Sequence, residues 1–85
     1  MAYTVELTPH AERQLAKLQK PIRARIEQAL LDLREEPRPS GVKKLKGTKD
    51  LYRIRVSEFR VIYEIIDTKL LVTVVKIADR KDSYR

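Results

Sequence analysis

Residues 51–66 read LYRIRVSEFRVIYEII, and this stretch decides the fold. Apolar and polar side chains alternate along residues 51–57, a pattern typical of a β-strand with one buried face. Ser57-Glu58 predicts a tight turn, and the alternation resumes from Phe59. The stretch therefore predicts two short antiparallel strands joined by that turn.

Three arginines fall on one face of this predicted hairpin. Successive side chains of a strand point to opposite faces of the sheet, so Arg53, Arg55 and Arg60 are expected to share one surface. Guanidinium groups keep their protons and repel one another, so stability does not require such a cluster. Arginine on the wet face of an antiparallel sheet can be no more than a solvated side chain. For three arginines beside a lysine-rich loop, an anionic partner is the better explanation.

The chain before the hairpin predicts one strand and two helices. Residues 3–7 alternate as a strand does, Thr8 can cap a helix, and Pro9 suits its first turn. A second amphipathic helix begins near Pro21 and ends before Pro37. The two helices form a hairpin whose apolar stripes are most simply explained by packing against a sheet.

The chain after the hairpin completes a meander. Residues 67–69 predict a turn and residues 70–77 a third strand, while residues 42–50 predict a loop. We therefore predict an α+β fold with an N-terminal strand, a two-helix hairpin and a three-stranded antiparallel meander. Residues 1–85 are expected to be a single domain, with one sheet, the helices on one of its faces, and the first strand at one side of the meander.

Composition excludes several classes of site. The chain has no cysteine and one histidine, which removes disulfides, thiolate nucleophiles and Cys- or His-rich metal sites. It has neither a long apolar run nor an apolar leader segment. We expect a cytoplasmic protein with no metal, no cofactor and no membrane partner.

Charge is distributed unevenly along the sequence. The net charge is +7, of which residues 1–40 carry +1 and residues 41–85 carry +6. The first half resembles a neutral scaffold and the second an anion-binding surface. Nucleic acid is the leading partner class, because it presents dense phosphate and releases counterions on binding.

Arginine, lysine and tyrosine together suit RNA cleavage. RNA carries its own nucleophile, the 2′-hydroxyl, and positioned guanidiniums stabilise charge that develops on the attacked phosphate. A base must accept the 2′ proton and an acid must protonate the leaving oxygen, each step contributing about 10²–10⁴-fold. Tyr84 is the better candidate base, provided that nearby cations lower its pKa, although a tyrosine so close to the chain end can also be a frayed aromatic.

Four segments together resemble a known family. They are LKG at residues 45–47, LYRIRV at 51–56, FRVIYEI at 59–65 and IADRKDSY at 77–84. This pattern is similar to that of the RelE/ParE superfamily of type II toxin–antitoxin toxins, on the RelE side. The resemblance implies a ribosome-dependent endoribonuclease that cuts mRNA in the A site without a metal.

The resemblance also assigns roles to individual residues. It implies that Arg60 stabilises the transition-state phosphate, that Arg80 supports the leaving group and that Tyr84 stacks on the RNA or takes its proton. These three are the expected catalytic residues. The expected RNA-binding residues are Lys43, Lys44, Lys46, Arg53, Arg55 and Lys81.

Expected partners and alternatives follow from the same family. The resemblance implies a RelB-like, acidic antitoxin, with the toxin monomeric when free and in a heterotetramer or larger assembly when bound. Ribosome and mRNA are the other expected partners. A ParE-like inhibitor of DNA gyrase and a catalytically inactive RNA- or ribosome-binding relative remain alternatives, because a shared fold does not fix function.

Overall fold

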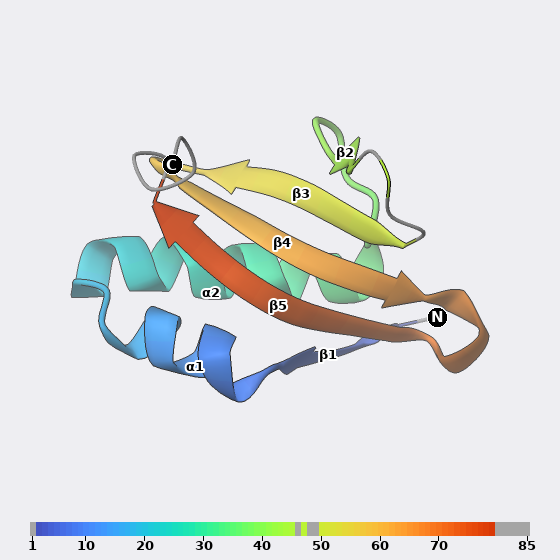
Figure 1. Ribbon diagram of the computed structural model, residues 1–85, viewed down its shortest axis with the longest axis horizontal. Coiled ribbons are helices and arrows are strands. Elements are labelled where there is room, and N and C mark those ends of the chain that lie inside the picture. The colour runs from blue at the N-terminus through green and yellow to red at the C-terminus, as the bar shows by residue number, and fades with distance from the viewer. Residues whose placement is uncertain (1, 46, 48–49, 80–85) are drawn as a thin grey trace.

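The computed structural model describes residues 2–45, 47 and 50–79. Figure 1 shows a twisted sheet with both helices of the described chain behind it. The elements in chain order are β1 (Thr4–Leu7), α1 (Pro9–Ala16), α2 (Lys20–Glu35), β2 (Lys43–Lys44), β3 (Leu51–Val56), β4 (Phe59–Ile66), a 3₁₀ turn (Asp67–Lys69) and β5 (Leu71–Asp79).

Within the described residues, five strands form one sheet in the order β1-β5-β4-β3-β2. Strands β3, β4 and β5 are antiparallel neighbours, which confirms the predicted meander. Strand β1 runs parallel to β5, so the first strand does join the meander at one side after the helices cross over. The predicted loop over residues 42–50 is wrong at two positions. Lys43 and Lys44 pair with Arg53 and Tyr52 and form the edge strand β2.

Both helices begin where the sequence indicates. Thr8 is the N-cap of α1, and its hydroxyl oxygen accepts a hydrogen bond from the backbone N–H of Ala11 at 3.1 Å. Pro9 and Pro21 stand in the first turns of α1 and α2, where a missing N–H costs no helical hydrogen bond. The Thr8 cap and the two prolines thus mark where the helices begin.

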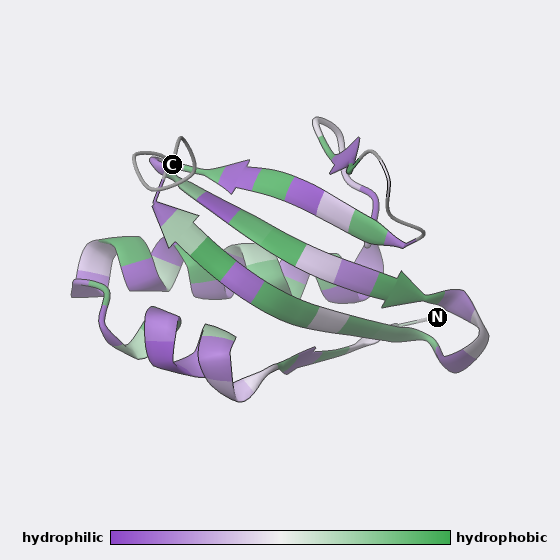
Figure 2. Ribbon diagram, in the orientation of Figure 1, coloured by the Kyte–Doolittle hydropathy of each residue, from purple (hydrophilic) through white to green (hydrophobic). Residues whose placement is uncertain are grey.

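The core lies between the helices and one face of the sheet. Residues that alternate along β3, β4 and β5 meet the apolar stripes of α1 and α2, and Figure 2 shows long hydrophobic stretches on β4 and β5. The buried cluster comprises Ala11, Ile26, Leu30, Leu33, Ile54, Val61, Tyr63, Ile65, Val72, Val74 and Ile77. No helix among the described residues is long and apolar enough to cross a membrane.

A β-bulge interrupts the pairing of β5 with β4. Ile62 pairs with Lys76 but the next residue, Tyr63, pairs with Val74, so Val75 is the extra residue. Helix α1 and its cap hold this bulge from the side. The Thr8 hydroxyl donates to the Val75 carbonyl at 3.4 Å, and the side-chain oxygen of Gln14 accepts from the Ile77 N–H at 2.7 Å.

Candidate nucleic-acid interface

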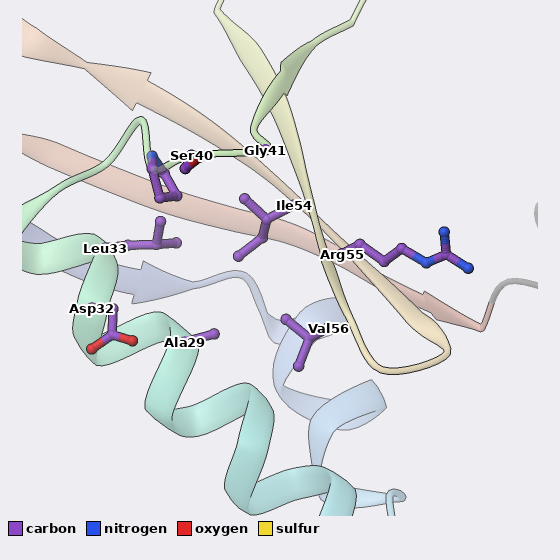
Figure 3. Close-up of a pocket in the computed structure, with 9 residues that line it drawn as sticks. Ala29, Asp32, Leu33, Ser40, Gly41, Ile54, Arg55 and Val56 are labelled. Atoms are coloured by element: carbon purple, nitrogen blue, oxygen red, sulfur yellow. The ribbon is translucent and has the colours of Figure 1, made fainter.

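The sheet face away from the helices carries the predicted arginine cluster. Arg55 and Arg60 are directly opposite each other on β3 and β4, and Arg53 is two residues along β3 on the same face. Figure 3 shows the Arg55 side chain leaving β3 on the side opposite to Ile54 and Val56, which point toward α2. The hairpin pattern thus predicted this surface correctly.

A hollow of about 150 Å³ lies among these groups. Its lining consists of Gly41, Lys43, Arg53, Arg55 and Arg60. The segment after α2 reaches the hollow through Gly41, whose φ of 89° is a left-handed conformation that glycine adopts without strain. Four cationic side chains around one small hollow form a site for an anion such as a phosphate group.

The two lysines of β2 lie on opposite faces of the sheet. Lys43 pairs with Arg53 and shares its face, so it joins the arginine cluster. Lys44 pairs with Tyr52, whose side chain is on the helix side of the sheet, so Lys44 is directed away from the cluster. Of this predicted pair, the structure brings Lys43 alone to the hollow among the described residues.

Lys76 is a further cation of this face that the pattern of the sequence did not reveal. Val72 and Val74 point into the core, so strict alternation would direct Lys76 inward as well. The bulge at Val75 changes the phase, and Lys76 pairs with Ile62 and is exposed. The one sequence feature that could have indicated this position is the occurrence of a lysine within an otherwise largely apolar strand.

Four predicted site residues lie outside the described residues. They are Lys46, Arg80, Lys81 and Tyr84. Their expected roles in binding or catalysis therefore stay predictions. Among the described residues, no group of three or more His, Cys, Asp or Glu side chains is placed to hold a metal ion.

A polar cluster fixes the segment that leads into the hollow. Arg38 binds Asp67 through both terminal nitrogens, at 2.9 and 3.3 Å, and its guanidinium lies 5.1 Å from the centre of the Tyr52 ring. The Tyr3 hydroxyl donates to Asp67 at 2.7 Å, and the buried Tyr63 hydroxyl donates to the carbonyl of Pro37 at 2.8 Å. The segment after α2 is thereby tied to β3, β4 and the 3₁₀ turn, and Asp67 also binds Tyr3, the residue before β1.

The ionisation of this cluster follows from its hydrogen bonds. Those from Arg38 and then Tyr3 hold the pKa of Asp67 below its ordinary value, and the bond to Asp67 raises the pKa values of Arg38 and Tyr3. Burial raises the pKa of Tyr63. At neutral pH the cluster thus holds a carboxylate, a guanidinium and neutral phenols.

A second hollow, of about 260 Å³, lies on the helix side of β3 (Figure 3). Apolar groups of α2 and β3 provide much of its lining, including Ala29, Leu33, Ile54 and Val56. It shares Gly41 and Arg55 with the lining of the basic hollow, but not Lys43, Arg53 or Arg60. Its chemistry does not favour an anion, so the basic hollow is the candidate site for nucleic acid.

Comparison with known proteins places this geometry in context. Residues 5–84 match the family model described as the ParE toxin of a type II toxin–antitoxin system, parDE. The mRNA interferase toxin RelE of Escherichia coli K12 is 32% identical over 85 residues, covering 98% of this chain and 88% of that relative.

Solved structures share the fold over nearly the whole length. A chain of the archaeal RelE–RelB complex from Pyrococcus horikoshii OT3 has a TM-score of 0.84 at 32% identity, covering 94% of this chain and 97% of that chain. A mutant of the E. coli toxin RelE in the free state has a TM-score of 0.83 at 29% identity, with 99% and 90% covered. Both the sequence and the arrangement of elements are therefore similar to those of these toxins.

Proposed function

The chain belongs to the RelE/ParE family of type II toxin–antitoxin toxins, and on that basis we propose that it is an endoribonuclease that cleaves mRNA in the ribosomal A site. The observation that carries the proposal is the anion-sized hollow ringed by Lys43, Arg53, Arg55 and Arg60 on the open face of the sheet. The name of the E. coli relative, an mRNA interferase, supports the choice of RNA as the anion.

The proposed reaction needs no nucleophile from the protein. The 2′-oxygen of the RNA attacks the adjacent phosphorus, the bond from phosphorus to the 5′-oxygen breaks, and a 2′,3′-cyclic phosphate and a 5′-hydroxyl result. The protein must stabilise the extra negative charge on the phosphate and move two protons. Such a reaction is metal-independent in our proposal.

Within the hollow, the arginines suit the first of these tasks. Arg55 and Arg60 are opposite each other, so a phosphate between them would meet two guanidiniums that are already in position. Preorganised donors of this kind stabilise the transition state without a cost of reorganisation when the charge develops. We assign Arg60 to the attacked phosphate, and Arg53 and Arg55 to the RNA backbone.

The proton transfers are assigned to the C-terminal segment. We propose that Tyr84 takes the 2′ proton or stacks beside the cleavage site and that Arg80 supports the leaving oxygen. Both residues follow β5 in the sequence, and β5 borders β4, which carries Arg60. A cation-rich site favours the ionised form of a phenol, which is what a tyrosine base requires.

The proposed partners are the ribosome and an antitoxin. Relatives have been solved as RelE–RelB complexes, and we propose that a RelB-like, acidic antitoxin binds this chain and neutralises the cationic face. Complementary charge favours such a partner, since the chain carries a net +7. We propose that the free toxin is monomeric and that the complex is a heterotetramer or larger.

Translation in vitro tests the proposed activity. The purified protein is added to a ribosome-dependent translation of a defined message, and primer extension maps the cuts. We expect discrete cuts at A-site codons that disappear when ribosomes are omitted. Arg60→Ala should reduce cutting by about 10²–10³-fold, the usual effect of losing one preorganised donor. Exposed Arg25 on α2 is the matched control, and Arg25→Ala should cut normally.

The family model that matches residues 5–84 carries the ParE name, which favours one second candidate. A ParE-like protein would inhibit DNA gyrase without cleaving RNA. An absence of cuts in translation together with inhibition of gyrase supercoiling would replace the first proposal by the second.

A further inference from the structure

Four residues form a straight row across the open face of the sheet. Lys43 on β2 pairs with Arg53 on β3, Arg53 pairs with Ile62 on β4, and Ile62 pairs with Lys76 on β5. Paired residues of neighbouring strands share a face. The row therefore places cations at both of its ends and a half-buried apolar side chain between Arg53 and Lys76. Since neighbouring strands are about 4.8 Å apart, the row spans about 14 Å, the length of a few nucleotides.

The position of Lys76 in this row depends on the β-bulge. If Val75 paired regularly, with no bulge, alternation from Val74 would place Val75 on the open face and turn Lys76 toward the helices. Hydrogen bonds from Thr8 and to Gln14 hold the backbone on both sides of Lys76. The exposed lysine is thus held on the open face by contacts from α1 and its cap.

Acidic residues mark the other end of the same face. Glu64 on β4 pairs with Thr73 on β5, and Thr73 pairs with Glu6 on β1. Glu64 is two residues from Ile62 along β4, so it is the next side chain on the open face. A phosphate chain that ran along the strands in this direction would approach two carboxylates and be repelled.

We propose that the RNA backbone crosses the sheet perpendicular to the strands, from β2 to β5, with Lys43 and Lys76 as the phosphate-binding residues at the two ends of the track. Arg53 binds a phosphate between them, and Ile62 supports a ribose or base by apolar contact. This inference rests on the proposed function, because it defines how the same face positions its substrate. Lys76 is a positioning residue in this scheme and does not touch the reacting atoms.

Salt dependence of binding tests the track. The probe is a short 2′-O-methyl RNA oligonucleotide, which cannot be cleaved because its 2′-oxygens are blocked. Its affinity for the protein is measured from about 50 to 200 mM salt, where each phosphate contact to a single strand contributes about 0.7 to the slope of log K against log salt. We expect Lys43→Gln and Lys76→Gln each to lower the magnitude of the slope by about 0.7, and the double variant by about 1.4.

Lys69 provides the matched control. It is an exposed lysine in the 3₁₀ turn beyond the acidic end of the face, where RNA running along the strands would pass. Lys69→Gln removes the same charge, and the proposal expects the slope to stay at the wild-type value. A lowered slope for Lys69→Gln with unchanged slopes for Lys43→Gln and Lys76→Gln would overturn the crossing direction.

The remaining outcomes separate this inference from the proposed activity. Absence of binding to the wild-type protein at about 50 mM salt, where charge contacts are strongest, would overturn the track itself. If the wild-type protein cuts mRNA on ribosomes but the salt slope does not change in Lys43→Gln and Lys76→Gln, the proposed activity stands and the proposed track is wrong. If the slopes change as expected but no mRNA is cut during translation, the track stands and the proposed activity is wrong.

Discussion

The side-chain oxygen of Gln14 accepts a hydrogen bond from the backbone N–H of Ile77 at 2.7 Å, between residues 63 positions apart. Strand β1 pairs with β5 as far as Val74, and helix α1 supplies the hydrogen bond farther along β5. A buried N–H without a partner is costly, so this contact stabilises the β-bulge. Because the bulge keeps the Lys76 side chain on the open face, this contact from α1 also helps to set the direction of that side chain.

The first prediction concerns this hydrogen bond. Gln14→Met keeps the size of the side chain but removes the acceptor, so it should lower the free energy of unfolding by about 1–3 kcal/mol. Gln14→Glu keeps an acceptor oxygen and should retain most of the stability. Urea unfolding of the three proteins measures the difference. Equal midpoints for Gln14→Met and the wild type would contradict a stabilising role for the contact.

The second prediction concerns acid stability. The pKa of Asp67 lies below its ordinary value of 3.8, because Arg38 and Tyr3 bind the ionised carboxylate. A pKa that is lowered in the folded state adds stability above the unfolded-state pKa, and this stability is lost as the pH falls through the folded-state value. Asp67→Asn should therefore melt below the wild type at pH 7.

The two melting temperatures should begin to converge as the pH falls below about 4 and should meet below the lowered folded-state pKa, where the carboxylate is protonated in both states. Thermal unfolding from neutral to acid pH measures the gap. A gap that stays constant down to the acid limit would mean that the charge of Asp67 does not stabilise the fold.

The third prediction concerns the buried phenol. Tyr63 is fully buried, and its hydroxyl donates to the carbonyl of Pro37. Tyr63→Phe leaves that carbonyl without its partner and should lower the free energy of unfolding by about 1 kcal/mol. Tyr52→Phe is the matched control, because the Tyr52 hydroxyl accepts a longer bond, 3.3 Å, from the exposed Arg38.

Urea unfolding measures both variants. We expect a lower midpoint with an unchanged slope for Tyr63→Phe, and a smaller change for Tyr52→Phe. Both variants keep the stacked rings, whose centres are 6.2 Å apart, so an equal loss in the two would mean that the buried hydroxyl contributes no more than the exposed one.

Local patterns were sufficient to predict much of this fold. The alternation over residues 51–66 defined the central hairpin and gathered Arg53, Arg55 and Arg60 on one face. Caps and prolines located both helices. These features depend on neighbouring residues, whose geometry follows from the periods of strands and helices.

The features that the sequence did not predict depend on distant partners. Strand β2 forms because β3 provides a pairing edge, and the side chains of Lys43 and Lys44 show no apolar alternation. The bulge at Val75 depends on Thr8 and Gln14, which are far away in the sequence. The position of Lys76 on the open face therefore required the three-dimensional structure.

The last prediction joins stability to function at Arg55 and Arg60. Like charges directly opposite each other on paired strands are destabilising. Arg55→Gln removes one charge of this pair and should raise the free energy of unfolding by roughly a few tenths of a kcal/mol at low salt. Lys76→Gln is the control, because it removes the same charge but pairs with apolar Ile62.

Salt provides the diagnostic for this pair. The gain from Arg55→Gln should disappear near 1 M salt, where the screening length is about 3 Å, and Lys76→Gln should show little gain at any salt. The same Arg55→Gln protein should also cut mRNA less efficiently, because the bound phosphate then contacts one guanidinium fewer. A variant less stable than the wild type at low salt would mean that the repulsion is already offset within the cluster. The expected result, more stability with less cleavage, would mean that this face is held in a repulsive state which phosphate relieves on binding.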